Sequence, residues 1–419
     1  MERRPPSGSS PAAALSLKLS EIMQPTKNDK IKGRPHQLLI LMSLMITVHG
    51  AAQSFSDVSD VLRDHILAEA EWAMTASPRT ITSSGCSRSA GGKHDFYSEG
   101  DYWWPDPQHP GGPYIQRDGI TNPDNFVDHR KALIRLSRIV GALASAYRLT
   151  GDDQYAARAF AHLNAWFVDT TTRMNPSLLY AQAISGRVTG RGIGIIDTIH
   201  LMEVAQGTRV IEASPLADQR IVGEVKHWFD QYLQWLLTHP YSRDEMNATN
   251  NHGTCWVMQV ASFARLTASD SILRICRDRY KEIILPNQMA TDGSFPRELG
   301  RTKPYGYSLF NLDAMAMVCQ ILSDDKNDLW NVQTADGKNI RKGIDFMYPF
   351  VRDKQAWPYA HDVMYWDNWP VAHPFLIMGA AHFGKREWFE TWKSLDHDPK
   401  VDEVLRNLPI RNPLIWLYN

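Results

Sequence analysis

The sequence predicts an all-α fold, an (α/α) toroid: an incomplete barrel of helical hairpins with a cleft built by loops at one end. Apolar residues recur with helical period through most of the chain after residue 56. Short turn segments separate these stretches, so that consecutive helices form hairpins. Few stretches alternate with period two, and a strand–helix–strand rhythm is absent from the sequence. A helical repeat solenoid is the competing geometry, but no repeat of fixed period supports it.

The first predicted helix lies in the stretch SDVSDVLRDHILAEAEWAM, where Val58, Leu62, Ile66 and Ala70 share one stripe. An irregular segment, residues 78–125, follows and is rich in glycine, proline and serine. Short strands are compatible with such a long loop, although no part of it shows a clear strand pattern.

Residues 128–167 predict two helices that form a hairpin. Gly151 suits the C-cap of the first helix, and Asp152 or Asp153 suits the N-cap of the second. Further helices are predicted at about residues 194–210, 217–238, 252–267, 270–285, 308–322, 339–349, 373–382 and 386–395.

The N-terminal residues have the architecture of a signal peptide. An apolar core at about 38–48 follows several basic residues and precedes the small residues Gly50, Ala51 and Ala52. The core is too short to span a membrane comfortably. We therefore expect an extension and signal peptide over 1–52, cleaved near Ala52 with Met23 as an alternative start, and one domain over 53–419. The expected location is periplasmic or secreted, with no stable membrane span after cleavage.

Composition excludes some classes of partner. The formal net charge of -1 over 419 residues argues against a nucleic-acid-binding protein, which usually presents a basic face. The 14 Trp, 15 Tyr and 14 Phe are compatible either with rings that stack on sugars or with a core of large residues. The 4 cysteines show neither a CxxC motif nor zinc-type spacing, and no compact Asp/His cluster predicts a metal site.

The stretch NATNNHGTCW, residues 247–256, begins one of the predicted helices. Thr249, Asn250 or Asn251 is expected to cap it, which places His252 in the first turn. The positive end of a helix disfavours a protonated imidazole, so His252 is expected to stay neutral and able to accept a proton. The same helix end, with asparagine amides beside it, suits a carboxylate. A structural cap with a packed histidine is the alternative.

A second candidate stretch, DGSFPRELGRTKPYGYSLFNLDAMA, offers Arg301, Tyr305 and Tyr307 just before another predicted helix. An arginine beside a tyrosine favours the tyrosinate and lowers the pKa of the phenol. Arginine also binds a carboxylate through two parallel hydrogen bonds. The alternative is a solvated basic loop with tyrosine rings packed beneath it.

Other loops offer groups that suit a sugar, although each group is equally compatible with local packing. Trp103 and Trp104 precede a proline in a loop and present flat rings. Polar side chains among glycine-rich turns, suited to sugar hydroxyls, and aromatic or imidazole side chains late in the chain complete the candidate set: Asn175, Tyr180, Gln182, His200, His361 and Tyr365.

Taken together, the motifs resemble the alginate-lyase superfamily of polysaccharide lyases. The matching elements occur in family order and cover nearly all of the chain after the signal peptide: DYWWPDP, PYIQRDG, TGDDQYAARA, TRMNPSLLYAQ, NNHGT and RELGRTKPYGYSLFNL. The resemblance implies an α/α toroid whose cleft binds an anionic polysaccharide. It is closer to lyases acting on mannuronan or glucuronan than to the shorter bacterial alginate lyases, whose motif is similar to NNHSYW. Here NNH continues as GTCW.

The resemblance implies β-elimination, in which C5 of a uronate loses its proton and the 4-O-glycosidic bond breaks to leave a 4,5-unsaturated uronate. It places Asn251 and Arg301 on the substrate carboxylate, whose charge must be neutralised. It makes Tyr307 both base and acid of a syn elimination, with Tyr305 as the alternative tyrosine. His252 is the second base, or helps to deprotonate the tyrosine; in an anti elimination it is the base itself. No metal or organic cofactor is implied.

Two other functions fit the same fold. A glycoside hydrolase needs two carboxylates that flank the scissile bond, and five residues are available for that role: Asp101, Asp106, Asp292, Glu298 and Asp362. A non-catalytic polysaccharide-binding protein needs only the cleft. The set Asn251, His252, Arg301 and Tyr307 argues for the lyase.

Overall fold

Five helices form the inner layer of the fold in the computed structural model, which describes residues 56–417. They are α3 (Asp128–Thr150), α5 (Leu201–Ile211), α8 (Asn251–Leu266), α12 (Pro304–Leu322) and α14 (Pro374–Phe383). Each of them contacts the next one in this order. Almost all residues of α8 and α12 are buried, as expected for helices enclosed by other helices.

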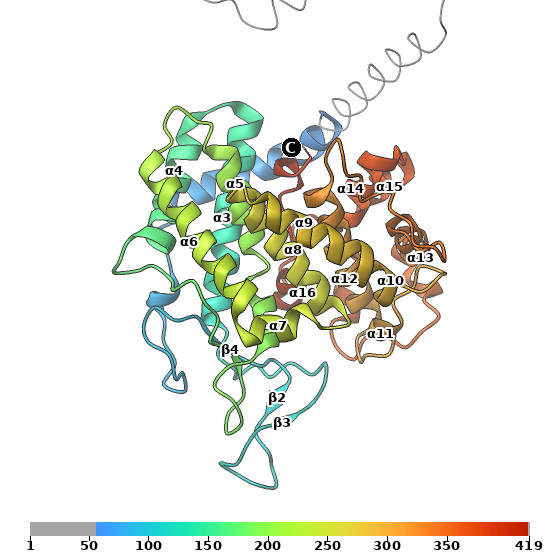
Figure 1. The fold of residues 1–419 in the computed structure, drawn as a ribbon, viewed down its shortest axis with the longest axis horizontal. Helices are drawn as coiled ribbons and strands as arrows, with labels where there is room; N and C mark the ends of the chain where they lie inside the picture. The colour runs from blue at the N-terminus through green and yellow to red at the C-terminus, as the bar shows by residue number, and fades with distance from the viewer. Residues whose placement is uncertain (1–55, 418–419) are drawn as a thin grey trace, which may run out of the picture. The chain divides into compact units, whose positions relative to one another are not determined.

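A second layer covers the inner helices from outside (Figure 1). Its members each pack on an inner helix: α4 (Asp153–Leu163) on α3, α6 (Gln219–Thr238) and α9 (Asp270–Arg279) on α8, α13 (Ile340–Arg352) on α12, and α15 (Arg386–Ser394) on α14. Pairs of inner and outer helices arranged in an incomplete ring make an α/α toroid. The predicted fold class is therefore confirmed.

The C-terminal segment returns to the beginning of the ring. The short helix η7 (Pro413–Ile415) contacts α3 and α5, and Gln206 Nε2 donates to the carbonyl oxygen of Ile415 at 2.6 Å. Helix α16 (Asp402–Asn407) precedes it. This return brings Arg406 next to residues of the loop before α3.

Two small sheets lie at one edge of the helical body (Figure 1). Strand β1 (Tyr97–Glu99) pairs in parallel with β4 (Tyr180–Ala183), and β2 (Trp103–Trp104) pairs antiparallel with β3 (Ile115–Gln116). All but β4 lie in the segment that the sequence predicts as irregular. They are too short to show a period of two, which explains why the pattern does not reveal them.

Shorter helical elements connect the main helices. The α-helices are α7 (Pro240–Met246), α10 (Leu285–Gln288) and α11 (Pro296–Leu299); the others are η1 (Ile81–Ser83), η2 (Asn164–Val168), η3 (Gly192–Thr198), η4 (Tyr280–Ile284), η5 (Lys354–Ala356) and η6 (Trp366–Asn368). Two of them are π-helical segments, η2 at the end of α4 and η4 at the end of α9. The helix predicted at 270–285 is therefore α9 continued by η4.

The first predicted hairpins are confirmed in detail. Residues 56–75 are helical, and the four residues of the predicted stripe are buried, each no more than 4% exposed. Gly151 ends α3 with a φ of 72°, and the side chain of Asp152 accepts a hydrogen bond from the backbone N–H of Gln154 at the start of α4. These caps depend on residues that are neighbours in the chain, so the sequence can predict them.

Much of the aromatic content belongs to the core. Nine of the 14 tryptophans are buried, and all 14 lie in the described part of the chain. Phe229, for example, is 0% exposed and lies 5.0 Å from Phe263 and 5.5 Å from Phe167 between ring centroids. Tryptophan number alone therefore gave no evidence for sugar binding.

Several predictions concern residues that lie partly or wholly outside the described ones. The signal peptide, its cleavage near Ala52 and the domain boundary at 52 and 53 stay predictions. Within residues 56–417 the four cysteines are free, and neither a metal-binding group of His, Cys, Asp and Glu nor a helix able to cross a membrane is found.

Truncation of a core ring on α6 tests the packing. Phe229→Ala should lower the free energy of unfolding by about 3–5 kcal/mol because it leaves a cavity between α6 and α8. Asp230→Ala is the matched control, since Asp230 is the exposed neighbour on the same helix, and it should change the stability by less than about 0.5 kcal/mol. Urea unfolding followed by circular dichroism gives both values; equal losses would show that this ring is not part of the core.

Candidate active site

One pocket, with a cavity volume of about 110 Å³, gathers residues from distant parts of the chain. Seven residues singled out by the sequence line it: Trp103, Gln182, His200, Asn251, His252, Arg301 and Tyr307. The other lining residues are Asp101, Tyr102, Gln116, Asp118, Arg130, Arg191, Ile193, Ile196, Asp197, Phe310, Arg406 and Asn407. The N-terminal ends of α8 and α12 therefore meet at the same cavity.

The start of α8 is held by a carboxylate from a distant segment. Glu298 in α11 accepts hydrogen bonds from the backbone N–H of Asn251 at 2.7 Å and from its side-chain Nδ2 at 2.8 Å. Asn250 is the N-cap residue, but no side-chain capping bond forms there. The expectation of a local cap is wrong, because Glu298 fills that role from 47 positions away in the sequence.

His252 is paired with a buried carboxylate. Its Nδ1 lies 2.7 Å from Oε1 of Glu245, whose side chain is 0% exposed. Burial alone would lower the pKa of His252, but the charge of Glu245 and the hydrogen bond to it outweigh burial, so the pKa is raised above its ordinary value. The helix end therefore does not lower the pKa of His252 as expected, because Glu245 supplies a nearer charge of opposite sign.

Arg301 is bound to Asp118 in the pocket. Its Nη2 and Nε donate to Asp118 at 2.9 Å and 3.4 Å, and its guanidinium lies 4.7 Å from the ring centroid of Tyr307. Its Nη1 is not engaged by Asp118. The predicted Arg301–Tyr307 pair is thus confirmed as a contact, with Asp118 as a neighbour that the sequence did not reveal.

Tyr307 lies in a polar chain of three side chains. Its hydroxyl is 2.7 Å from that of Tyr102, which accepts a hydrogen bond from Arg406 Nη2 at 2.9 Å. Burial raises the pKa of Tyr307 above its ordinary value, although Arg301 acts to lower it. The expected net lowering of this pKa is wrong, because burial outweighs the attraction of the Arg301 cation.

The first turn of α12 is also capped from a distance. The carboxylate of Asp362 accepts from the backbone N–H groups of Tyr305 and Gly306, both at 2.9 Å, and burial raises its pKa to about 6. The helix begins at Pro304, earlier than the predicted residue 308. Pro304 suits the first helical position, where no N–H is needed.

Tyr305 lies outside the pocket, unlike its neighbour Tyr307. It is 0% exposed, and its hydroxyl donates to the carbonyl oxygen of Phe350 at 3.0 Å. Its ring packs on Trp357 and Trp366. The structure therefore contradicts its use as the alternative tyrosine or as a substrate contact.

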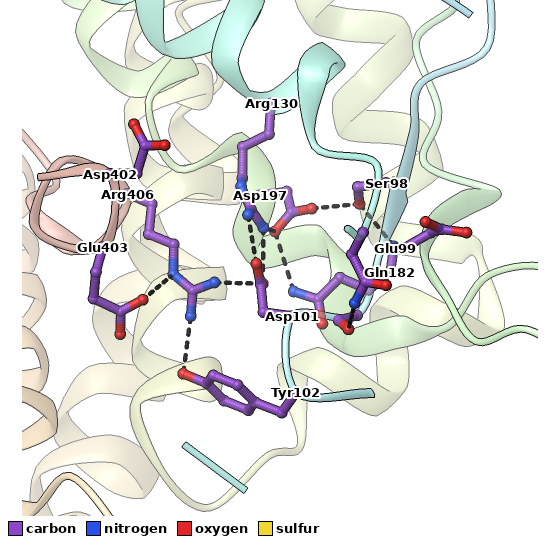
Figure 2. Close-up of polar contacts among 12 residues, drawn as sticks. Ser98, Glu99, Asp101, Tyr102, Arg130, Gln182, Asp197, Asp402, Glu403 and Arg406 are labelled. Atoms are coloured by element: carbon purple, nitrogen blue, oxygen red, sulfur yellow. Dashed lines mark hydrogen bonds and ion pairs between the residues drawn. The ribbon is translucent and has the colours of Figure 1, made fainter. Parts of the chain in front are cut away.

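An ionic network forms one wall of the pocket (Figure 2). Asp101 forms ion pairs with Arg130, at 2.6 Å, and with Arg406. Burial alone would raise the pKa of Asp101, but the two guanidinium groups outweigh burial and lower it. Arg130 also contacts Asp197, which accepts from Gln182 Nε2 at 3.1 Å.

Two further predicted residues stand out in this wall. Gln182 has a φ of 48°, a left-handed backbone conformation that costs free energy in a residue with a side chain. His200 is 1% exposed. Burial lowers the pKa of His200 well below its ordinary value, which keeps the imidazole neutral.

The remaining predicted residues do not line this pocket. Trp104 donates through Nε1 to the carbonyl oxygen of Ile120, and Asn175 donates to Asp95. The structure likewise places the other four elsewhere: Tyr180 faces Gly91, Asn250 accepts from Gln288 through its carbonyl, His361 stacks on Trp366, and Tyr365 lines a neighbouring cavity. These six residues therefore do not line this pocket, and their role as substrate contacts stays a prediction.

The five carboxylates available to a hydrolase do not form a pair across the pocket. Of the five, Asp101 alone lines it, and Arg130 and Arg406 neutralise that charge. Asp106 and Asp292 are engaged in local turns, and Glu298 and Asp362 cap α8 and α12 as described above. Asp118 and Asp197 also line the pocket, but they are paired with Arg301 and Arg130. This arrangement gives little support to two-carboxylate chemistry.

Sequence reasoning missed several pocket residues for a common reason. Tyr102 lies within the quoted DYWWPDP motif but meets Tyr307 205 positions away, and Arg406 meets Tyr102 across 304 positions. Asp118 likewise meets Arg301 across 183 positions. Two of these residues carried a local signal, because Tyr102 lies in the quoted motif DYWWPDP and Asp118 in PYIQRDG.

Comparisons with known proteins agree with this geometry. The family model described as alginate lyase matches residues 80–357. A crystal structure of an alginate lyase from Bacteroides ovatus is 30% identical, with a TM-score of 0.75 over 88% of this chain and 98% of that chain. Alginate lyase A1-III from Sphingomonas species A1 is 15% identical, with a TM-score of 0.51 over 84% and 94%, a likeness of fold alone. No curated protein matched the chain.

A methyl group at the second residue after Asn251 should disturb the site. A Cβ at Gly253 would lie 2.2 Å from the carbonyl oxygen of Ala248, so Gly253→Ala should lower the free energy of unfolding by about 1–3 kcal/mol as α8 shifts. Gly223→Ala is the control: a Cβ there meets nothing within 4 Å, and this change should stabilise α6 by about 0.4–1 kcal/mol. Urea unfolding measures both; a Gly253→Ala protein as stable as the control would contradict the close approach.

Proposed function

The chain belongs to the alginate lyase family of polysaccharide lyases, and on that premise we propose that it cleaves a 1,4-linked polyuronate by β-elimination. The substrate we propose is alginate, in particular polymannuronate, or glucuronan. The observation that carries the proposal is the meeting of Asn251, His252, Arg301 and Tyr307 at one cavity. These side chains supply the charge neutralisation and the proton carriers that elimination requires.

The carboxylate of the uronate is the first group that the site must bind. Asn251 keeps one N–H of its amide beyond the one given to Glu298, and Arg301 keeps Nη1 beyond the contacts to Asp118. The N-terminal end of α8 adds a favourable dipole. In our proposal these donors neutralise the carboxylate, so that the negative charge that develops on loss of the C5 proton is spread onto it and stabilised.

Proton transfer is assigned to Tyr307 and His252. The raised pKa of Tyr307 means that the tyrosine enters the cycle protonated, so it must first transfer its proton to a neighbour, for which we propose His252. In a syn elimination the tyrosinate takes the C5 proton, the C4–O4 bond breaks as C4=C5 forms, and the tyrosine returns the proton to O4. Where the C5 proton and O4 lie on opposite faces of the sugar ring, His252 takes the C5 proton and Tyr307 protonates O4. No water is consumed in either case.

We also propose that the protein is exported. The support is the apolar run 38–48 with basic residues before it and small residues after it. An extracellular or periplasmic place suits an enzyme whose substrate is a polymer. Among residues 56–417 no helix has the length and apolarity of a membrane span.

A substrate panel tests the reaction. We expect an increase in the ultraviolet absorbance of a conjugated alkene with polymannuronate or glucuronan. We expect none with hyaluronan, in which N-acetylglucosamine separates successive uronates. Polyguluronate tests the effect of the configuration at C5. Chain shortening without alkene absorbance would favour the hydrolase. Binding without any shortening would favour the non-catalytic protein.

Removal of one hydroxyl tests the assignment of Tyr307. Tyr307→Phe should lower kcat by at least about 10²-fold, the usual contribution of a positioned acid or base, while binding of a saturated oligouronide persists. Tyr305→Phe is the matched control, because its hydroxyl is bonded to a backbone carbonyl outside the pocket, and it should retain the turnover of the wild type. Equal turnover of Tyr307→Phe and wild type would refute the assignment.

A further inference from the structure

We propose that Glu245 is a positioning residue for the elimination, which holds His252 in the tautomer that carries its proton on Nδ1 and turns Nε2 toward the pocket. The inference rests on the proposed function for its effect on turnover. The contact itself can be tested without it.

The distance between the two side chains shows which imidazole nitrogen of His252 contacts Glu245. Oε1 of Glu245 lies 2.7 Å from Nδ1 of His252. An ionised carboxylate can only accept hydrogen bonds, so Nδ1 must carry the proton in both the neutral and the charged imidazole. Nε2, on the opposite edge of the ring, is then the nitrogen that holds the lone pair when the ring is neutral.

The surrounding fold makes Glu245 a fixed support. It lies in α7, which packs on α8, and the two helices are also joined by a hydrogen bond of 2.7 Å from Trp256 Nε1 to Ser242 Oγ. Glu245 is fully buried, whereas the side chain of His252 is 18% exposed. The carboxylate therefore lies behind the ring as seen from the pocket, out of reach of a polymeric substrate.

The groups around the Glu245–His252 pair leave His252 as the main partner of the Glu245 carboxylate. His252 is also faced by Glu298 and Arg301, and Glu245 by Arg191 and Tyr232. Arg191 donates hydrogen bonds to Gln182 rather than to Glu245, and Oε2 of Glu245 has no hydrogen-bond partner among the described residues. A buried carboxylate with so few partners depends on the imidazole for compensation.

Two consequences follow for the reaction. The lone pair of neutral His252 faces the cavity, where it can take a proton from Tyr307 or from C5. The imidazolium that results is stabilised by Glu245, in agreement with the raised pKa of His252. The arrangement resembles in principle the carboxylate that orients the histidine of a Ser-His-Asp triad.

Two substitutions separate the charge from the contact. Glu245→Gln retains an oxygen that can accept from Nδ1 but removes the charge, and Glu245→Ala removes both. We expect kcat to fall in both, by about 10²-fold in Glu245→Ala, with KM little changed because Glu245 does not reach the substrate. The acid limb of the kcat profile should move to lower pH in both, because the pKa of His252 falls when the negative charge is lost.

The chain offers a matched control. His373 Nδ1 lies 2.7 Å from Asp313 in a second buried histidine–carboxylate pair, which does not line the pocket. Asp313→Asn should lower the melting temperature without moving the pH profile. This control separates loss of a buried ion pair from loss of the proposed role.

Nitrogen-15 NMR of the imidazole, assigned with a His252→Gln variant, reads the tautomer directly. We expect Nδ1 protonated in the wild type, and a lower pKa of His252 in both Glu245 variants. An unchanged pKa, or a kcat loss whose pH profile equals that of the wild type, would overturn the inference. The wild type could form no alkene while its His252 is protonated on Nδ1 and the pKa of His252 falls in both Glu245 variants. That result would refute the proposed function and support the tautomer assignment.

Discussion

The N-terminal ends of α8 and α12 are capped by carboxylates from distant segments, and the pocket depends on this constraint. Glu298 caps α8 and Asp362 caps α12, each by accepting from backbone N–H groups in the first turn. Unpaired N–H groups at a buried helix end are costly, so the segments that carry these carboxylates must fold against the helices. The helix starts that present Asn251 and Tyr307 are thereby fixed relative to each other.

The same requirement shapes the electrostatics of the site. Buried glutamates pair with Asn251 and His252, and two arginines neutralise Asp101 in the wall of the pocket. Charges that are paired behind the surface leave hydrogen-bond donors facing the cavity, which suits a substrate that brings its own carboxylate. Burial in the pocket also raises the pKa of Tyr307, which must ionise in the proposed reaction.

The sequence predicted what local patterns control. The hairpin at Gly151 and Asp152 and the length of most helices follow from neighbours within a few positions. The start of α8 at NNH, in contrast, is capped by the distant Glu298. The resemblance to a family added the grouping of distant residues, and seven of the fourteen predicted site residues line the pocket. Contacts such as Glu245–His252 could not be predicted, because neither the burial of a glutamate nor the direction of an imidazole is visible in a sequence. The pKa expectations for His252 and Tyr307 failed for the same reason.

The central claim is that this pocket performs an elimination. Mass spectrometry of the products from a saturated oligouronide of defined length tests it most directly, because elimination adds no water whereas hydrolysis adds one molecule per bond cleaved. The account predicts that the masses of the two products sum to the mass of the substrate. A sum that exceeds the substrate by one water molecule would contradict it.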